Sequence, residues 1–307
     1  MTCGHGVTQM SLAAVGWAFA VATVAVQIPY PLAGGSGRRA LTVASVLLFC
    51  ATSVVHAART RRAGWTAGMI AITAGGGLVA ETAGVHTGLV FGRYTYTDAL
   101  GPDLAGVPTV IPLAWTMMAY PAFVLGQHVT WRLVGTEGHA DGTGPADGTG
   151  PADGTGPADG TGRGVAVTAL AGGLLLATWD LYLDPQMVDA GYWHWSGGGP
   201  AINGVPLSNA AGWLAVGAAI TAMLALLPEP RRVCDRLFPD MLPFIMIGWT
   251  YASSLLANLV FFDRPAVAVA GGVGMGTVLT GAGVVAVATR PVTRPVTRPV
   301  TTRRQEP

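Results

Sequence analysis

Eight apolar segments, each about as long as a membrane is thick, dominate this sequence. Roughly twenty residues of helix cross about 30 Å of hydrocarbon. Only 11% of the 307 residues are charged, against about a quarter in a typical soluble domain. We therefore predict an all-α, polytopic membrane helix bundle of about eight transmembrane helices, with seven as the alternative count. The segments are 11–30, 40–58, 65–85, 108–130, 164–183, 208–228, 241–262 and 266–289.

The basic residues indicate how such a bundle is oriented. All 17 are arginine, and 13 of them fall in the C-terminal segment and the loops after the second, fourth and sixth segments. The alternate loops hold only Arg38, Arg39, Arg93 and Arg264. Because positive charge is retained on the cytoplasmic side, we predict that both termini are cytoplasmic in a multi-pass protein of the cell membrane.

Composition also excludes several classes of site. Without lysine there is no retinal or pyridoxal phosphate Schiff base and no Walker A loop. The three cysteines and six histidines are scattered and lack the spacing of metal ligands. We expect no metal and no cofactor, and a net charge of +1 gives no reason to expect a nucleic-acid partner.

Two low-complexity segments divide the chain. A Gly-Thr-Gly-Pro-Ala-Asp repeat makes 141–163 a flexible linker, and Arg-Pro-Val-Thr repeats make 290–307 a disordered basic tail attracted to anionic lipid. The predicted organisation is residues 1–140 with the first four helices and an acidic, aromatic loop over 86–107, then 164–289 with the last four helices.

Polar residues recur at one depth in four of the segments. Gln27, Glu81, Asp180 and Asn258 each lie about fifteen residues from the cytoplasmic end, or ~8 Å short of the outer edge of the hydrocarbon. Asn209 starts the sixth segment at a similar height. Ionisable residues inside a membrane normally face the bundle interior and mark function, so we predict a polar pocket in the outer half.

The loops at that level are acidic and aromatic. The alternative interpretation of their Tyr and Trp side chains is an interfacial aromatic belt, and His86 and His194 also have the simpler interpretation of ordinary loop histidines. Asp180 and Asp184 are four residues apart, so both carboxyl groups should share one helix face. We expect Pro185 to end that helix.

A buried carboxyl group in this setting suggests acid catalysis. Burial disfavours its charged form, so it can donate a proton at neutral pH. Protonation of an isolated carbon–carbon double bond produces a tertiary cation, which aromatic faces stabilise. Capture of that cation by water yields a tertiary alcohol without a cofactor.

Long stretches of the chain resemble the membrane carotenoid hydratases of the CruF type, which include hydratases of bisanhydrobacterioruberin and of gamma-carotene. The stretches are 81–98, 101–121, 179–189, 191–195 and 204–213, and the resemblance covers about 65–262. It implies addition of water to the terminal double bond of an acyclic or monocyclic C40 or C50 carotenoid within the lipid bilayer. Association with other membrane enzymes of the carotenoid pathway is a further expectation.

The resemblance supplies no catalytic assignment, so the candidate residues come from depth and spacing. Glu81 or Asp180 is the expected proton donor, and Asp184 is the partner that tunes the donor or orients water. The expected substrate-binding residues are Tyr94, Tyr96, Trp115, Tyr120, Trp179, Trp193, His194, Asn209, Trp213 and Asn258.

Two other functions fit parts of the sequence. The spacing of Asp180 and Asp184 also occurs in UbiA-like prenyltransferases, although binding a diphosphate through Mg²⁺ needs more carboxylates and nearby cations. Buried carboxyl groups also relay protons in proton-coupled transporters, but the two halves of the chain show no convincing repeat apart from acids at a similar depth.

Overall fold

The computed structural model describes residues 6–140, 162–198, 200–202, 204–228 and 241–288. The predicted basic tail and all but the last two residues of the predicted linker lie outside these ranges. Helices account for most of the described chain. They are α1 (Gly6–Gln27), α2 (Gly35–Arg61), α3 (Ala63–Ile70), α4 (Gly76–Thr87), α5 (Val110–Ala140), α6 (Gly162–Asp189), α7 (Leu207–Leu226), α8 (Met241–Val260) and α9 (Pro265–Ala288).

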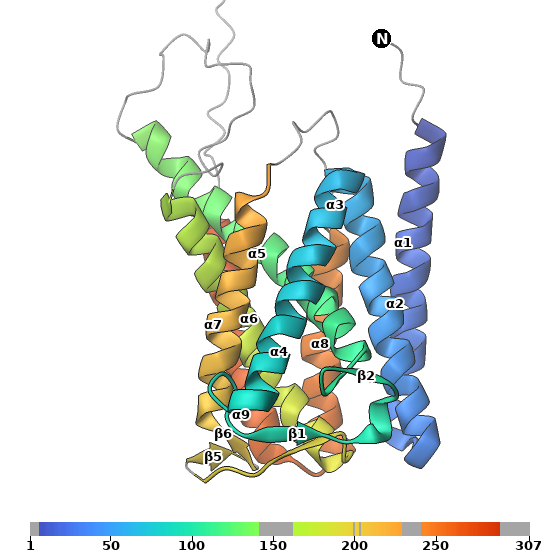
Figure 1. Ribbon diagram of the computed structural model, residues 1–307. Helices are drawn as coiled ribbons and strands as arrows, with labels where there is room; N and C mark the ends of the chain where they lie inside the picture. The colour runs from blue at the N-terminus through green and yellow to red at the C-terminus, as the bar shows by residue number, and fades with distance from the viewer. Residues whose placement is uncertain (1–5, 141–161, 199, 203, 229–240, 289–307) are drawn as a thin grey trace, which may run out of the picture.

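Within the described residues, eight helical segments are long and apolar enough to cross a membrane. Seven contain one long helix each, and the remaining one joins α3 to α4 through a π-helical turn over Ala71–Gly75. The helices stand side by side as a bundle (Figure 1). The predicted all-α, multi-pass architecture is thus confirmed.

Three short antiparallel strand pairs gather at one end of the bundle, which we call the strand end (Figure 1). Helices α4 and α6 finish at this end, and α5 and α7 start there. One pair links the two longest described loops, since β1 (Tyr94–Tyr96) pairs with β4 (Trp193–Trp195). The other pairs are β2 (Asp103–Leu104) with β3 (Val107–Pro108), and β5 (Ala201–Ile202) with β6 (Val205–Pro206).

Two helix ends differ from the sequence-based expectation. The prediction that Pro185 ends its helix is wrong, because α6 continues to Asp189 with the proline inside it. A proline inside a helix removes its own N–H donor and its ring crowds the carbonyl group four residues earlier, but membrane helices tolerate this where neighbouring groups compensate. Helix α4 also reaches Thr87, so His86 lies in its last turn and the loop begins at Gly88, whose φ is +69°.

Glycines bring α5, α6 and α7 into close contact. A Cβ atom on Gly126 of α5 would lie 2.5 Å from the backbone oxygen of Thr168 in α6, and one on Gly173 of α6 would lie 2.9 Å from the backbone oxygen of Leu214 in α7. Helices in lipid associate through such backbone proximity. The three helices therefore pack closely against one another.

Candidate active site

The carboxyl group of Glu81 is buried and held by three donors from other elements. Trp115 Nε1 of α5 donates to Oε1 at 3.0 Å. The hydroxyl groups of Tyr94 and Tyr96, both on β1, donate to Oε2 at 2.5 and 2.8 Å. Hydrogen bonds to an ionised acceptor are short and about twice as strong as neutral ones. The arrangement therefore suits a carboxylate.

Small residues on α4 make room for these donors. Gly77, Glu81 and Gly84 lie on one face of the helix, because residues separated by three or four positions stack along it. A Cβ atom on Gly77 would lie 2.5 Å from Cγ of Trp115, and one on Gly84 would lie 2.9 Å from the hydroxyl oxygen of Tyr94. The two glycines thus allow the indole and the phenol to reach the carboxyl group.

A second acidic group lies between α6 and α7. Asp180, Asp184 and Asn209 are each at most 3% exposed. The side-chain amide of Asn209 donates to Oδ2 of Asp180 at 2.6 Å and also to Oδ2 of Asp184, so the two acids share a helix face as their spacing predicted. Oδ1 of Asp180 is buried without a hydrogen-bond partner. The indole of Trp193 on β4 is within hydrogen-bonding reach of Asp184.

The carboxyl group of Glu81 and the Asp180–Asp184 pair both lie near the phenols of Tyr94 and Tyr96. Burial, followed by the carboxylate of Glu81, raises the pKa of Tyr94 and Tyr96 above the usual 10.0, and the charge of Asp184 raises both further. Both phenols therefore remain protonated donors at physiological pH. Glu81 and Asp184 both lie within electrostatic range of these phenols, and Asn209 joins Asp184 to Asp180, so the three carboxyl groups form one candidate site.

Aromatic rings fill the space beside the acids. Trp115 stacks on Trp213 of α7 with 4.3 Å between ring centroids and 16° between planes, and Trp179 of α6 meets Trp213 edge-on at 5.8 Å. Phe91, which is 2% exposed, contacts Tyr94, Trp115 and Trp213. Sequence reasoning missed Phe91 because an apolar loop residue carries no polar signal. Such ring faces attract a cation.

The β1–β4 pair covers the acids with one of its faces. Successive side chains of a strand point to opposite faces, so Tyr96 meets Trp193 with centroids 5.5 Å apart on the side that carries the contacts to the carboxyl groups. Thr95 and His194 pair on the other side, where they are bonded to each other at 3.0 Å and exposed. His194 is therefore not brought to the acids.

Three further residues singled out from the sequence, Tyr120 as an expected substrate-binding residue and Asn258 and Gln27 by their depth, also lie outside the acidic cluster. Tyr120 is bonded to Nδ1 of His56 at 2.8 Å. Asn258 donates to the backbone oxygen of Ser254 within α8, and Gln27 accepts from Trp249 at 2.7 Å. Of the four polar residues predicted to lie at one depth, Glu81 and Asp180 belong to the acidic cluster, whereas Gln27 and Asn258 do not.

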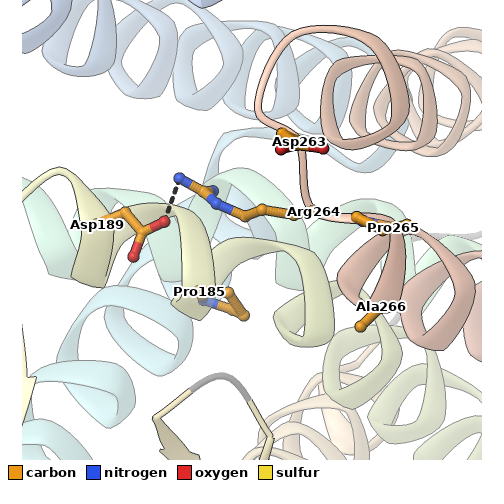
Figure 2. A pocket seen from close by; sticks show the side chains of 6 residues that line it. All are labelled: Pro185, Asp189, Asp263, Arg264, Pro265 and Ala266. Atoms are coloured by element: carbon orange, nitrogen blue, oxygen red, sulfur yellow. Dashed lines mark ion pairs between the residues drawn. The ribbon is translucent and has the colours of Figure 1, made fainter.

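A separate polar hollow of about 370 Å³ lies nearby at the strand end. Figure 2 shows Arg264, from the loop between α8 and α9, reaching toward Asp189 at the end of α6, with 2.5 Å between Nη2 and Oδ2. Pro185, the residue after Asp184, also lines it. None of the predicted site residues does.

Comparison with known proteins identifies the family. Residues 41–279 match the model of a family described as carotenoid biosynthesis protein. Bisanhydrobacterioruberin hydratase of Haloarcula japonica is 28% identical over 198 residues, which are 62% of this chain and 57% of that relative. The chain thus spans less than two thirds of the relative's length, and no solved structure matches it. Because the matched region covers most of the chain and includes Glu81, Asp180 and Asp184, this protein belongs to the carotenoid biosynthesis protein family.

Proposed function

We propose that this protein adds water to the terminal double bond of an acyclic carotenoid end group and produces a tertiary alcohol. The observation that carries the proposal is the meeting of Glu81, Asp180 and Asp184 beneath aromatic rings at one end of a membrane bundle. A relative named as a hydratase supports the same reaction class. The substrate is a C40 or C50 carotenoid that reaches the site from the bilayer.

The reaction needs one acid and one water molecule. The π electrons of the terminal double bond take a proton from Glu81 or Asp180 and form a new C–H bond, which leaves a cation on the neighbouring tertiary carbon. A lone pair of water forms the C–O bond, and the second proton of that water passes to a carboxylate. Addition of water changes no overall oxidation state, so the reaction requires no electron acceptor.

The aromatic side chains would hold the reacting end of the polyene. Trp115, Trp179 and Trp213 gather beside the acids, and a ring face turned toward the polyene there would stabilise a tertiary cation. Tyr96 and Trp193 cover the site from the strand side and would limit access of bulk water, so that a cation meets only the water admitted to the site.

Expression in a host that makes acyclic C40 carotenoids, with and without a C50-forming elongase, tests the reaction. Pigments extracted from cells with the wild-type protein should gain the mass of one water molecule per hydrated end. Glu81→Gln and Asp180→Asn should not yield this product at equal protein levels in the membrane. Asp98→Asn, which changes an exposed acid at the same end, is the matched control. Wild-type hydration in both acid variants would refute the proposed acid chemistry.

A further inference from the structure

The surroundings of Glu81 consist of hydrogen-bond donors. An indole N–H can only donate, so Oε1 must accept from Trp115. Two phenols reach Oε2, and an ionised carboxylate accepts from both at once. A proton on Oε2 would require one of the two phenols to reverse its role. The ionised form therefore satisfies every contact of this side chain.

The surroundings of Asp180 and Asp184 show the opposite balance. The amide of Asn209 serves both carboxyl groups, the indole of Trp193 reaches Asp184, and Oδ1 of Asp180 is buried without a partner. Within the described part of the chain, no arginine forms an ion pair with either acid; Arg264 pairs with Asp189 instead. Two carboxylates that share a buried site repel each other, and holding one proton between them relieves the repulsion.

We infer that the Asp180–Asp184 pair holds a single shared proton and delivers it to the double bond, whereas Glu81 remains a carboxylate that stabilises the cation. This inference rests on the proposed hydration and decides between the two donors left open there. It also gives Asn209 a positioning role, because its amide keeps the two aspartates together.

The assignment yields a closed cycle. The shared proton forms the new C–H bond, and the pair becomes doubly ionised next to a cation that is also near Glu81. When water attacks the cation, its released proton returns to the pair, and the unpartnered Oδ1 of Asp180 is the acceptor available for it. Glu81 keeps the same charge throughout, so it requires no proton route of its own.

Infrared spectroscopy of the purified protein in lipid nanodiscs, without substrate, tests where the proton is. A protonated carboxyl group gives a C=O stretching band that a carboxylate lacks. We expect this band in the wild type, in Glu81→Gln and in the control Asp98→Asn, and its loss in Asp180→Asn or Asp184→Asn. A band that vanishes in Glu81→Gln, persists in both aspartate variants or is missing from the wild type would overturn the inference.

Isotope labelling makes the test independent of whether the variants fold. Carbon-13 in the side-chain carboxyl of aspartate should shift the wild-type band, whereas the same label in glutamate should not. The opposite result would assign the proton to a glutamate. These spectra are recorded without turnover, so they test the position of the proton separately from the reaction. The proton assignment can be wrong although hydration is observed in cells, and hydration can be absent although the spectra match the assignment.

Turnover separates a charge role for Glu81 from a structural one. Glu81→Gln should reduce hydration by about 100-fold or more, the usual effect of removing one group that stabilises a transition state. Glu81→Asp retains the negative charge and should recover part of that loss. If Glu81→Asp were no more active than Glu81→Gln while both remained folded, Glu81 would not act through its charge.

Discussion

Adding one methyl group at Gly77 should disable the site without changing any polar residue. The Cβ atom of Gly77→Ala would lie 2.5 Å from Cγ and 2.6 Å from Cδ1 of Trp115. Carbon atoms in contact prefer a separation of about 3.5–4.0 Å. The indole or helix α4 must therefore move by roughly 1 Å, and the stacking of Trp115 on Trp213 at 4.3 Å leaves the indole little room.

Both stability and activity should respond. Overpacking of a tight interior costs about 1–3 kcal/mol, and a displacement of roughly 1 Å in a positioned group can reduce turnover by about 100-fold. The hydrogen bond from Trp115 to Glu81, 3.0 Å in length, would be stretched beyond its normal range. We expect a lower midpoint of thermal unfolding in detergent and a large loss of hydrated pigment.

A matched control lies two residues away. Gly75→Ala changes the same glycine run, but its Cβ would have no atom within 4 Å, and its φ of −68° suits alanine. It should behave as the wild type. A Trp115→Ala background removes the two closest contacts, with Cγ and Cδ1, and leaves only the contact with Cβ at 2.8 Å, so Gly77→Ala should cost less there than in the wild type. Wild-type stability and hydration in Gly77→Ala would refute this account of how α4 and Trp115 fit together.

Three further changes test other parts of the site. Asn209→Leu removes the amide between Asp180 and Asp184 and should cost about 1–3 kcal/mol, seen as a lower unfolding temperature that an exposed substitution does not produce. His194→Ala should retain wild-type hydration, since His194 is exposed on the outer face of its strand; a large loss would mean that this face contacts the substrate. The raised pKa of Tyr96 keeps its phenol neutral in the folded protein. Its contribution to the free energy of unfolding is therefore complete at lower pH. That contribution declines above about pH 10, because the phenol ionises there in the unfolded chain. Unfolding temperatures measured across that range should fall less steeply in Tyr96→Phe, and an identical slope would contradict the assignment.

The helix count was predictable because it follows from the thickness of a membrane, and similar positions along their segments indicated that Glu81 and Asp180 lie toward the same end of the bundle. Each crossing requires a long apolar run, and the position of a residue along the run sets its height. Rotation about the helix axis was harder to predict. Helix α4 is apolar around most of its circumference, so no amphipathic stripe indicated that Glu81 faces the bundle.

Contacts made by pairing of strands far apart in the chain could not be predicted from the spacing of residues along the sequence. The register that places Tyr96 opposite Trp193 joins loops nearly a hundred residues apart, and it alone decides that His194 faces outward. Pro185 shows a different limit: a local rule predicted a helix end, but hydrogen bonds beyond the proline, such as that from the N–H of Ala190 to the oxygen of Gln186, continue the helical path.

The contributors to the acidic site come from both sides of the segment that separates α5 from α6. The earlier side supplies Glu81 and its donors, and the later side supplies Asp180, Asp184 and Asn209. On the proposed chemistry, a growing chain that has inserted only its first helices has the stabilising anion but no source of protons. Nascent or truncated copies would then leave the polyenes around them unaltered, and hydration would begin only when synthesis has passed α7.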